Sequence, residues 1–152
     1  MTLEDMDDII TFVSRLENAL VLRPQAGDGS PSIAWDDVFF YYSTDGRPPR
    51  TQPFATIVTK NYPDDARSRL DRPGAFRLNI AVGRAVFTHV LGFEPQQIED
   101  RDIDYAARDV LMPHPLYGSA GWLAVVNPST TAPETLLETA YHRQRARLTG
   151  RT

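Results

Sequence analysis

The stretch AFRLNIAV, residues 75–82, constrains the fold most strongly because its side chains alternate with a period of two. In a β-strand, successive side chains point to opposite faces of the sheet. One set of positions is apolar and consists of Phe76, Leu78, Ile80 and Val82. The other set includes Arg77 and Asn79. The pattern therefore predicts a strand with one face on a core and a second face that carries Arg77 and Asn79.

Three further segments are rich in β-branched and aromatic residues, which favour strands. These predicted strands cover residues 33–43, 54–60 and 121–127. Helical periodicity predicts helices over residues 2–20, 83–91 and 103–108, and from about residue 132 onward. Thr2 with Asp5, and Thr131 with Glu134, resemble capping boxes, and Gly92 suits the C-cap of the second helix.

The order of these elements indicates the fold class. Successive strands follow one another without helices between them, which disfavours a parallel sheet built from βαβ units. We expect an α+β fold in which an antiparallel sheet packs against N-terminal and C-terminal helices. Such a sheet can leave its second face open to water. A chain of 152 residues is the length of one domain, so a single domain over residues 1–152 is predicted.

Composition excludes several functional classes. The chain has no cysteine, which excludes disulfides, thiolate metal sites and cysteine nucleophiles. The net charge of −4 argues against a dedicated, sequence-independent nucleic-acid binder. The acidic start MTLEDMDDII differs from a basic signal peptide, and no apolar run reaches the roughly 20 residues that span a bilayer. We expect a cytoplasmic protein without a membrane partner; the oligomeric state stays open.

Several strings in the chain resemble a known family. The segments FFYY, FATIVTK, SRLDRPGAFRLNI and HPLYGSAGWLAVVNP resemble an uncharacterised family of small bacterial proteins, a domain of unknown function. This resemblance implies no known activity or catalytic residue. The chain is more distantly similar to MmcQ/YjbR-like proteins, in which Arg77–Ile80 matches a strand and His114 with Trp122 matches a loop. That resemblance implies a frataxin-like plan and DNA binding through a double wing.

The polar face of the 75–82 strand is the first candidate site. If a loop covers this face, Arg77 and Asn79 become the floor of a pocket, since polar groups within an apolar wall are typical of ligand sites. The expected rim consists of Lys60, Trp35, His114 and Tyr117. Our first hypothesis is a non-enzymatic binding protein whose ligand is an anionic or aromatic small molecule or a partner macromolecule.

An arginine-rich segment is the second candidate. Arg67, Arg69 and Arg72 lie between two predicted strands, and arginine forks suit phosphates and carboxylates. This spacing makes nucleic-acid binding an alternative hypothesis. Asp64, Asp65 and Asp71 interleave with the arginines, so the segment can also pair with itself.

His114, in the stretch LMPHPLYGSAGW, is the third candidate. A histidine titrates near neutral pH and can act as a general acid or base, which makes a small enzyme a further hypothesis. Alternatively, the flanking prolines hold a rigid entry to the next strand, where His114 caps backbone groups. The other histidines, His89 and His142, do not lie at ligand spacing to it, so a metal site is not expected. We also predict no cofactor.

Overall fold

The computed structural model describes residues 5–129 and 133–150. Its centre is a six-stranded antiparallel sheet with the strand order β1-β2-β3-β4-β6-β5. The strands are β1 (Ala19–Leu22), β2 (Val38–Tyr42), β3 (Ala55–Val58), β4 (Arg77–Ala81), β5 (Met112–Pro113) and β6 (Trp122–Val126). The α-helices are α1 (Met6–Ser14), α2 (Arg84–Leu91) and α3 (Glu134–Thr149), and the 3₁₀ helices are η1 (Ser32–Ala34), η2 (Pro95–Asp100) and η3 (Gly118–Ala120). The predicted α+β fold is confirmed.

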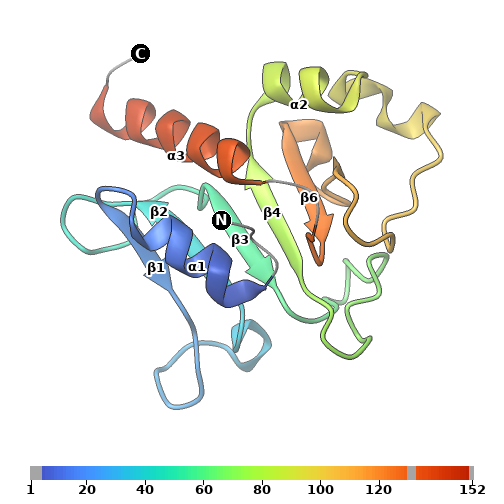
Figure 1. Ribbon diagram of the computed structural model, residues 1–152. Coiled ribbons are helices and arrows are strands. Elements are labelled where there is room, and N and C mark those ends of the chain that lie inside the picture. Colours follow the sequence, from blue (N-terminus) through green and yellow to red (C-terminus); the bar gives the residue numbers. More distant parts are fainter. Residues whose placement is uncertain (1–4, 130–132, 151–152) are drawn as a thin grey trace.

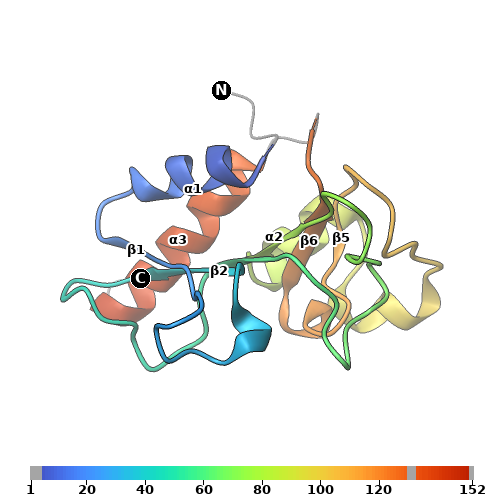
Figure 2. The ribbon, with the colours of Figure 1, turned by 90° about the horizontal axis from the view of Figure 1, so that it is seen from below.

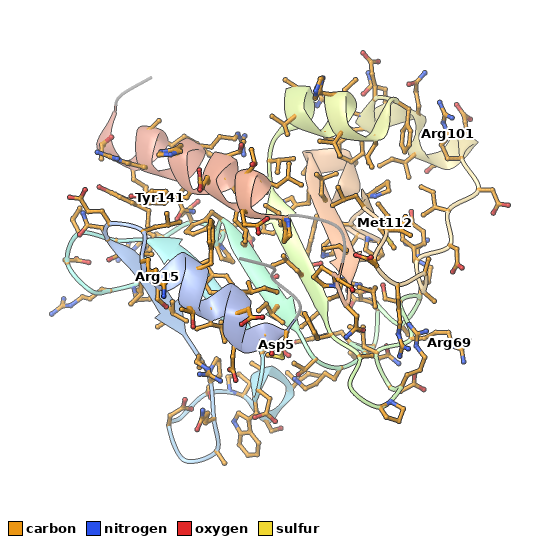
Figure 3. All side chains as sticks on the ribbon, in the orientation of Figure 1. Asp5, Arg15, Arg69, Arg101, Met112 and Tyr141 are labelled. Atoms are coloured by element: carbon orange, nitrogen blue, oxygen red, sulfur yellow. The ribbon has the colours of Figure 1, made fainter. Side chains whose placement is uncertain are left out.

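Helices α1 and α3 lie on the same face of the sheet (Figure 1 and Figure 2). Ile9 of α1 and Leu137 of α3 are fully buried in one cluster with Leu78 of β4. Tyr141, labelled on α3 in Figure 3, packs edge-on against Phe54 with 6.0 Å between ring centroids. Burial of these apolar side chains supplies the main stabilisation of this layer. Within the described ranges, no helix is long and apolar enough to cross a membrane.

The second face of the sheet is covered by loops instead of helices. In the register of the sheet, Asn79 pairs with Thr56 on β3 and with Ala124 on β6. A smaller apolar cluster builds up on this face, and it consists of Leu70, Ala75, Met112, Ala124 and Val126. Arg77 and Asn79 are each only 1% exposed, so β4 is buried on both faces at its centre.

The N-terminal helix is shorter than predicted. It ends at Ser14 instead of residue 20, and residues 19–22 form the edge strand β1. Asn18 adopts a left-handed backbone conformation with φ of 61° in the turn that follows α1 and leads the chain into β1. Asp5 caps α1 by accepting a hydrogen bond from the backbone N–H of Asp8 at 2.8 Å. Thr2, from the predicted capping box, lies outside the described residues.

The helix predicted over residues 103–108 is wrong. The chain instead forms η2 earlier, and the Asp104 side chain then accepts a hydrogen bond from the N–H of Ala106 in a local turn. Arg108 forms a bridge with Val126, and Asp109 has a φ of 61°, so both are drawn to the sheet. The C-cap at Gly92 is confirmed by its φ of 80°. Thr131, from the second capping box, lies outside the described residues.

Candidate functional site

A tight turn brings the connection between β3 and β4 over the second face of the sheet. The backbone N–H of Tyr62 donates to the carbonyl of Asp65 at 3.1 Å, and the N–H of Asp65 donates back at 2.9 Å. This turn directs the Asp65 carboxylate onto Arg77, which donates to its two oxygens from Nη1 at 3.0 Å and from Nη2 at 2.6 Å. A bidentate pair of this kind fixes both side chains in orientation as well as in distance.

Arg77 is the centre of a buried polar network. Its Nε donates to Oδ1 of Asn79 at 2.8 Å, and its Nη1 donates to Oγ of Ser68 at 2.9 Å. Asn79 in turn donates from Nδ2 to Oγ1 of Thr56 at 2.9 Å. Burial alone would raise the pKa of Asp65, but the hydrogen bonds and charge of Arg77 outweigh burial and hold that pKa below its usual value. The network is thus a charge-balanced, hydrogen-bonded floor.

His114 stands beside this floor as a neutral imidazole. Its Nδ1 accepts hydrogen bonds from the backbone N–H groups of Leu116 at 3.0 Å and Tyr117 at 3.1 Å. Because Nδ1 is an acceptor, the ring proton is on Nε2. Burial, and secondly the charge of Arg77, lower the pKa of His114 to about 3. The ring is therefore neutral at physiological pH.

Among the described residues, no acceptor lies within hydrogen-bond distance of the Nε2–H of His114. Nε2 lies 3.4 Å from Nη2 of Arg77, but both atoms carry N–H groups, so this contact joins two donors. The backbone holds the ring in place, since the N–H of His114 donates to the carbonyl of Trp122 at 3.0 Å. His114 is consequently a fixed hydrogen-bond donor.

A hollow with a volume of about 310 Å³ lies above the floor. Its polar lining includes Arg77, Asn79, Thr56, Asp64, Asp65 and His114. Its walls carry five aromatic side chains, which are Phe39, Tyr41, Tyr62, Tyr117 and Trp122. Tyr117 lies 4.8 Å from the ring of His114 and 6.3 Å from that of Trp122, measured between ring centroids. The arrangement offers flat apolar surfaces around a small number of fixed donors.

Asp37 holds Tyr62 in its place in the wall. The Asp37 carboxylate is fully buried and accepts hydrogen bonds from the hydroxyl of Tyr62, from the N–H and hydroxyl of Thr59, and from Nζ of Lys60 at 2.9 Å. Burial, and then the bond to Asp37, raise the pKa of Tyr62 well above its usual value. Lys60 also donates to the carbonyl of Trp35 at 2.6 Å. Lys60 and Trp35 thus support the wall from behind and do not line the hollow, in contrast to the predicted rim.

Two of the three arginines in the arginine-rich segment form contacts within the protein. Arg67 donates to the carbonyl of Pro115 and stacks 4.4 Å from the ring centroid of Tyr105. Arg72 donates to three backbone carbonyls, which belong to Ser68, Arg69 and Ala106. Arg69 is exposed at the outer edge of the molecule (Figure 3). Arg67 and Arg72 tie together the loops that cover the sheet.

The interleaved acidic residues contribute one ion pair among the described residues. Asp65 pairs with Arg77. Asp64 lies at the rim of the hollow, and Asp71 is exposed. No group of three or more His, Asp or Glu side chains in the described part of the chain is arranged to hold a metal ion.

The comparison with protein families matches the whole chain. The family model described as "Family of unknown function (DUF6194)" covers residues 1–152. The chain belongs to DUF6194. This membership agrees with the resemblance to an uncharacterised family. The similarity to MmcQ/YjbR-like proteins is not shown. No curated protein and no solved structure matches this DUF6194 chain.

Sequence reasoning missed several residues of the site. Phe39 and Tyr41 alternate along β2, so a period of two in VFFYY could have placed both on the face that carries Asn79. Asp65 and Thr56 were not identified because their partners are set by tertiary structure. The prediction did bring Arg77, Asn79, His114 and Tyr117 together, and the structure places all four on the same hollow.

Proposed function

We propose that this protein binds a small molecule through a planar aromatic ring, which enters the hollow above Arg77 and Asn79. The observation that carries the proposal is the combination of five aromatic walls with a rigid polar floor in one cavity of about 310 Å³. Ligand sites commonly combine apolar walls with a few fixed polar groups of this kind. The ring stacks between the aromatic walls and accepts a hydrogen bond from Nε2 of His114.

The balanced charge of the Arg77 network at the floor of the hollow favours a ligand whose ring is uncharged. Arg77 is already paired with both oxygens of Asp65, so its positive charge is balanced inside the network. Asp64 adds a negative charge at the rim. Of the described residues that line the hollow, Arg77 is the one cation, and Asp65 balances its charge. An anionic group there would therefore lose its hydration without gaining an unpaired positive charge, which costs free energy. Of the two small-molecule classes that the sequence suggested, the aromatic class fits this cavity better.

The state of His114 supports binding more than general acid–base catalysis. A general base needs a free acceptor atom and a pKa near the working pH. Nδ1 of His114 is occupied by two backbone N–H groups, and the pKa is about 3. A fixed neutral donor is suited to recognising a carbonyl or a ring nitrogen. The cytoplasmic location expected from the sequence stays a prediction.

Fluorescence of Trp122 tests the proposal. Replacing Trp35, which lies outside the hollow, by phenylalanine leaves Trp122 as the single tryptophan reporter. The probes are the uncharged ring compounds nicotinamide, adenosine and benzyl alcohol. We expect a saturable change in Trp122 emission with at least one probe. Tyr117→Ala should weaken binding of that probe by about fivefold or more, because it removes a stacking side chain worth about 1–3 kcal/mol.

Phe12→Ala is the control, since Phe12 of α1 packs against the main core on the other face of the sheet and does not line the hollow. It should leave the dissociation constant unchanged within a factor of two. The proposal fails if none of the uncharged probes gives a saturable signal. It also fails if the two alanine variants weaken binding equally.

A further inference from the structure

A second groove, with a volume of about 370 Å³, opens where α3 crosses the ends of β4 and β6. Arg143 and Arg147 of α3 line it. The hollow described above holds a balanced ion pair, whereas this groove presents two cationic side chains. Among the described residues, neither guanidinium forms an ion pair with a carboxylate.

Arg143 is held in place by the backbone of the β4–α2 junction. Its Nη1 donates to the carbonyl of Ala81 at 2.8 Å. Its guanidinium lies against Gly83, where an added Cβ would come within 2.8 Å of Nε and Cζ. Burial, and secondly the charge of Arg147, lower the pKa of Arg143. The guanidinium is therefore positioned before any ligand arrives.

Arg147 lies one helical turn after Arg143. Residues four apart on a helix are neighbours, and like charges at this spacing repel one another by a few tenths of a kcal/mol. An anion between two guanidinium groups removes this repulsion and accepts several charge-assisted hydrogen bonds. The groove thus has the charge and the donors of an anion site.

The groove and the hollow share a wall. Gln52, Pro53 and Trp122 line both cavities. Gln144 of α3 fixes this wall, because its Nε2 donates to the carbonyl of Gln52 at 2.7 Å and its Oε1 accepts from the N–H of Tyr42 at 2.7 Å. The two cavities therefore adjoin each other at Trp122.

We propose that Arg143 and Arg147 bind a phosphate or carboxylate group of the same ligand whose ring occupies the hollow. The ligand class is then an aromatic compound with an acidic substituent. This inference rests on the proposed function for the position of the ring. The anion site itself stands on the two arginines and their groove.

Pairs of neutral and acidic probes test the inference. Adenosine is compared with adenosine 5′-monophosphate, benzyl alcohol with phenylacetate, and inorganic phosphate is titrated alone, all by calorimetry and by Trp122 emission. At least one acidic probe should bind ten or more times as tightly as its neutral partner. A gain with the monophosphate alone identifies phosphate as the group, and a gain with phenylacetate alone identifies carboxylate.

Variants that each remove one positive charge show which arginine causes the tighter binding of the acidic probes. Arg147→Gln should reduce it to less than threefold, and so should Arg143→Gln if thermal unfolding shows that the variant is folded. Arg145→Gln removes the same charge from the same helix but outside the groove, and it should preserve the gain. Arg147 is exposed, so its replacement is not expected to disturb folding.

The possible failures are distinguishable. If neutral rings bind and the acidic forms bind no more tightly, the anion site is refuted while the ring site stands. If only inorganic phosphate and the acidic probes bind, with loss in Arg147→Gln, the anion site stands and the ring site is refuted. An equal loss in Arg145→Gln and Arg147→Gln, or no binding by any probe, overturns the inference.

Discussion

At the scale of single residues, the site depends on two side chains that are buried although they are polar. Arg77 is tolerated in the interior because Asp65, Ser68 and Asn79 satisfy its N–H groups. His114 is tolerated because it stays neutral and binds backbone N–H groups. An unpaired charge at either position would cost several kcal/mol. These contacts make the floor of the hollow rigid before a ligand binds.

The pKa of His114 predicts a dependence of stability on pH. The unfolded chain takes up a proton at His114 below about pH 6.5, whereas the folded protein does so only near pH 3. The folded state is therefore fully favoured above pH 6.5 and loses up to about 1.4 kcal/mol for each pH unit below it. The window from pH 7.5 to pH 5 avoids the titration of Asp65, whose lowered pKa affects stability only at more acidic pH.

Urea unfolding of the wild type and of His114→Asn at these two pH values measures this effect. The asparagine oxygen can replace Nδ1 as the backbone acceptor but does not titrate. The wild type should lose about 2 kcal/mol more than the variant between pH 7.5 and pH 5. An equal pH dependence in the two proteins would show that His114 does not stay neutral in the fold.

At the scale of secondary-structure elements, the sequence predicts the presence of an element more accurately than the residue at which it ends. The alternating pattern in residues 75–82 correctly predicts strand β4, because one face of this strand is apolar and the other carries Arg77 and Asn79. The helix predicted over residues 2–20 extends too far because Leu16 and Leu20 continue the helical spacing. The turn at Asn18 and the pairing of β1 with β2 depend on a strand that lies far along the chain, so local periodicity does not detect them.

The junction between η3 and β6 makes an element-scale prediction. Gly121 has a φ of +88°, and a Cβ there would lie 2.8 Å from the carbonyl carbon of Gly83. Gly46 also has a positive φ, of +75°, but a Cβ would meet nothing within 4 Å. In both variants, an alanine in the left-handed backbone conformation lowers the free energy of unfolding by about 1–2 kcal/mol. Only Gly121→Ala adds a backbone clash.

Chemical denaturation should thus show that Gly121→Ala is less stable than Gly46→Ala by at least about 2 kcal/mol. The clash would push β6 and the start of α2 apart. If the two variants are equally stable, the close approach of these two backbone segments is not a feature of the folded protein.

At the scale of the whole molecule, the two faces of the sheet have different roles. Helices α1 and α3 cover one face and form the main core (Figure 2). Loops cover the other face, on which the hollow lies. The sequence predicts which residues of β4 point toward each face, but not which loop covers the second one. That depends on Asp65 meeting Arg77 and on Arg67 meeting Pro115, a contact across 48 residues.

The central claim is that an aromatic ring binds in the hollow above Arg77 and Asn79. Backbone ¹H–¹⁵N NMR spectra, recorded during titration with the uncharged ring compound that binds most tightly, test this claim most directly. The account predicts that the largest shift changes occur at Thr56, Asn79 and Tyr117, on the elements that line the hollow. Shift changes concentrated at Gln96, Glu99 and Asp102, in the neighbouring cavity beyond His114, would contradict it.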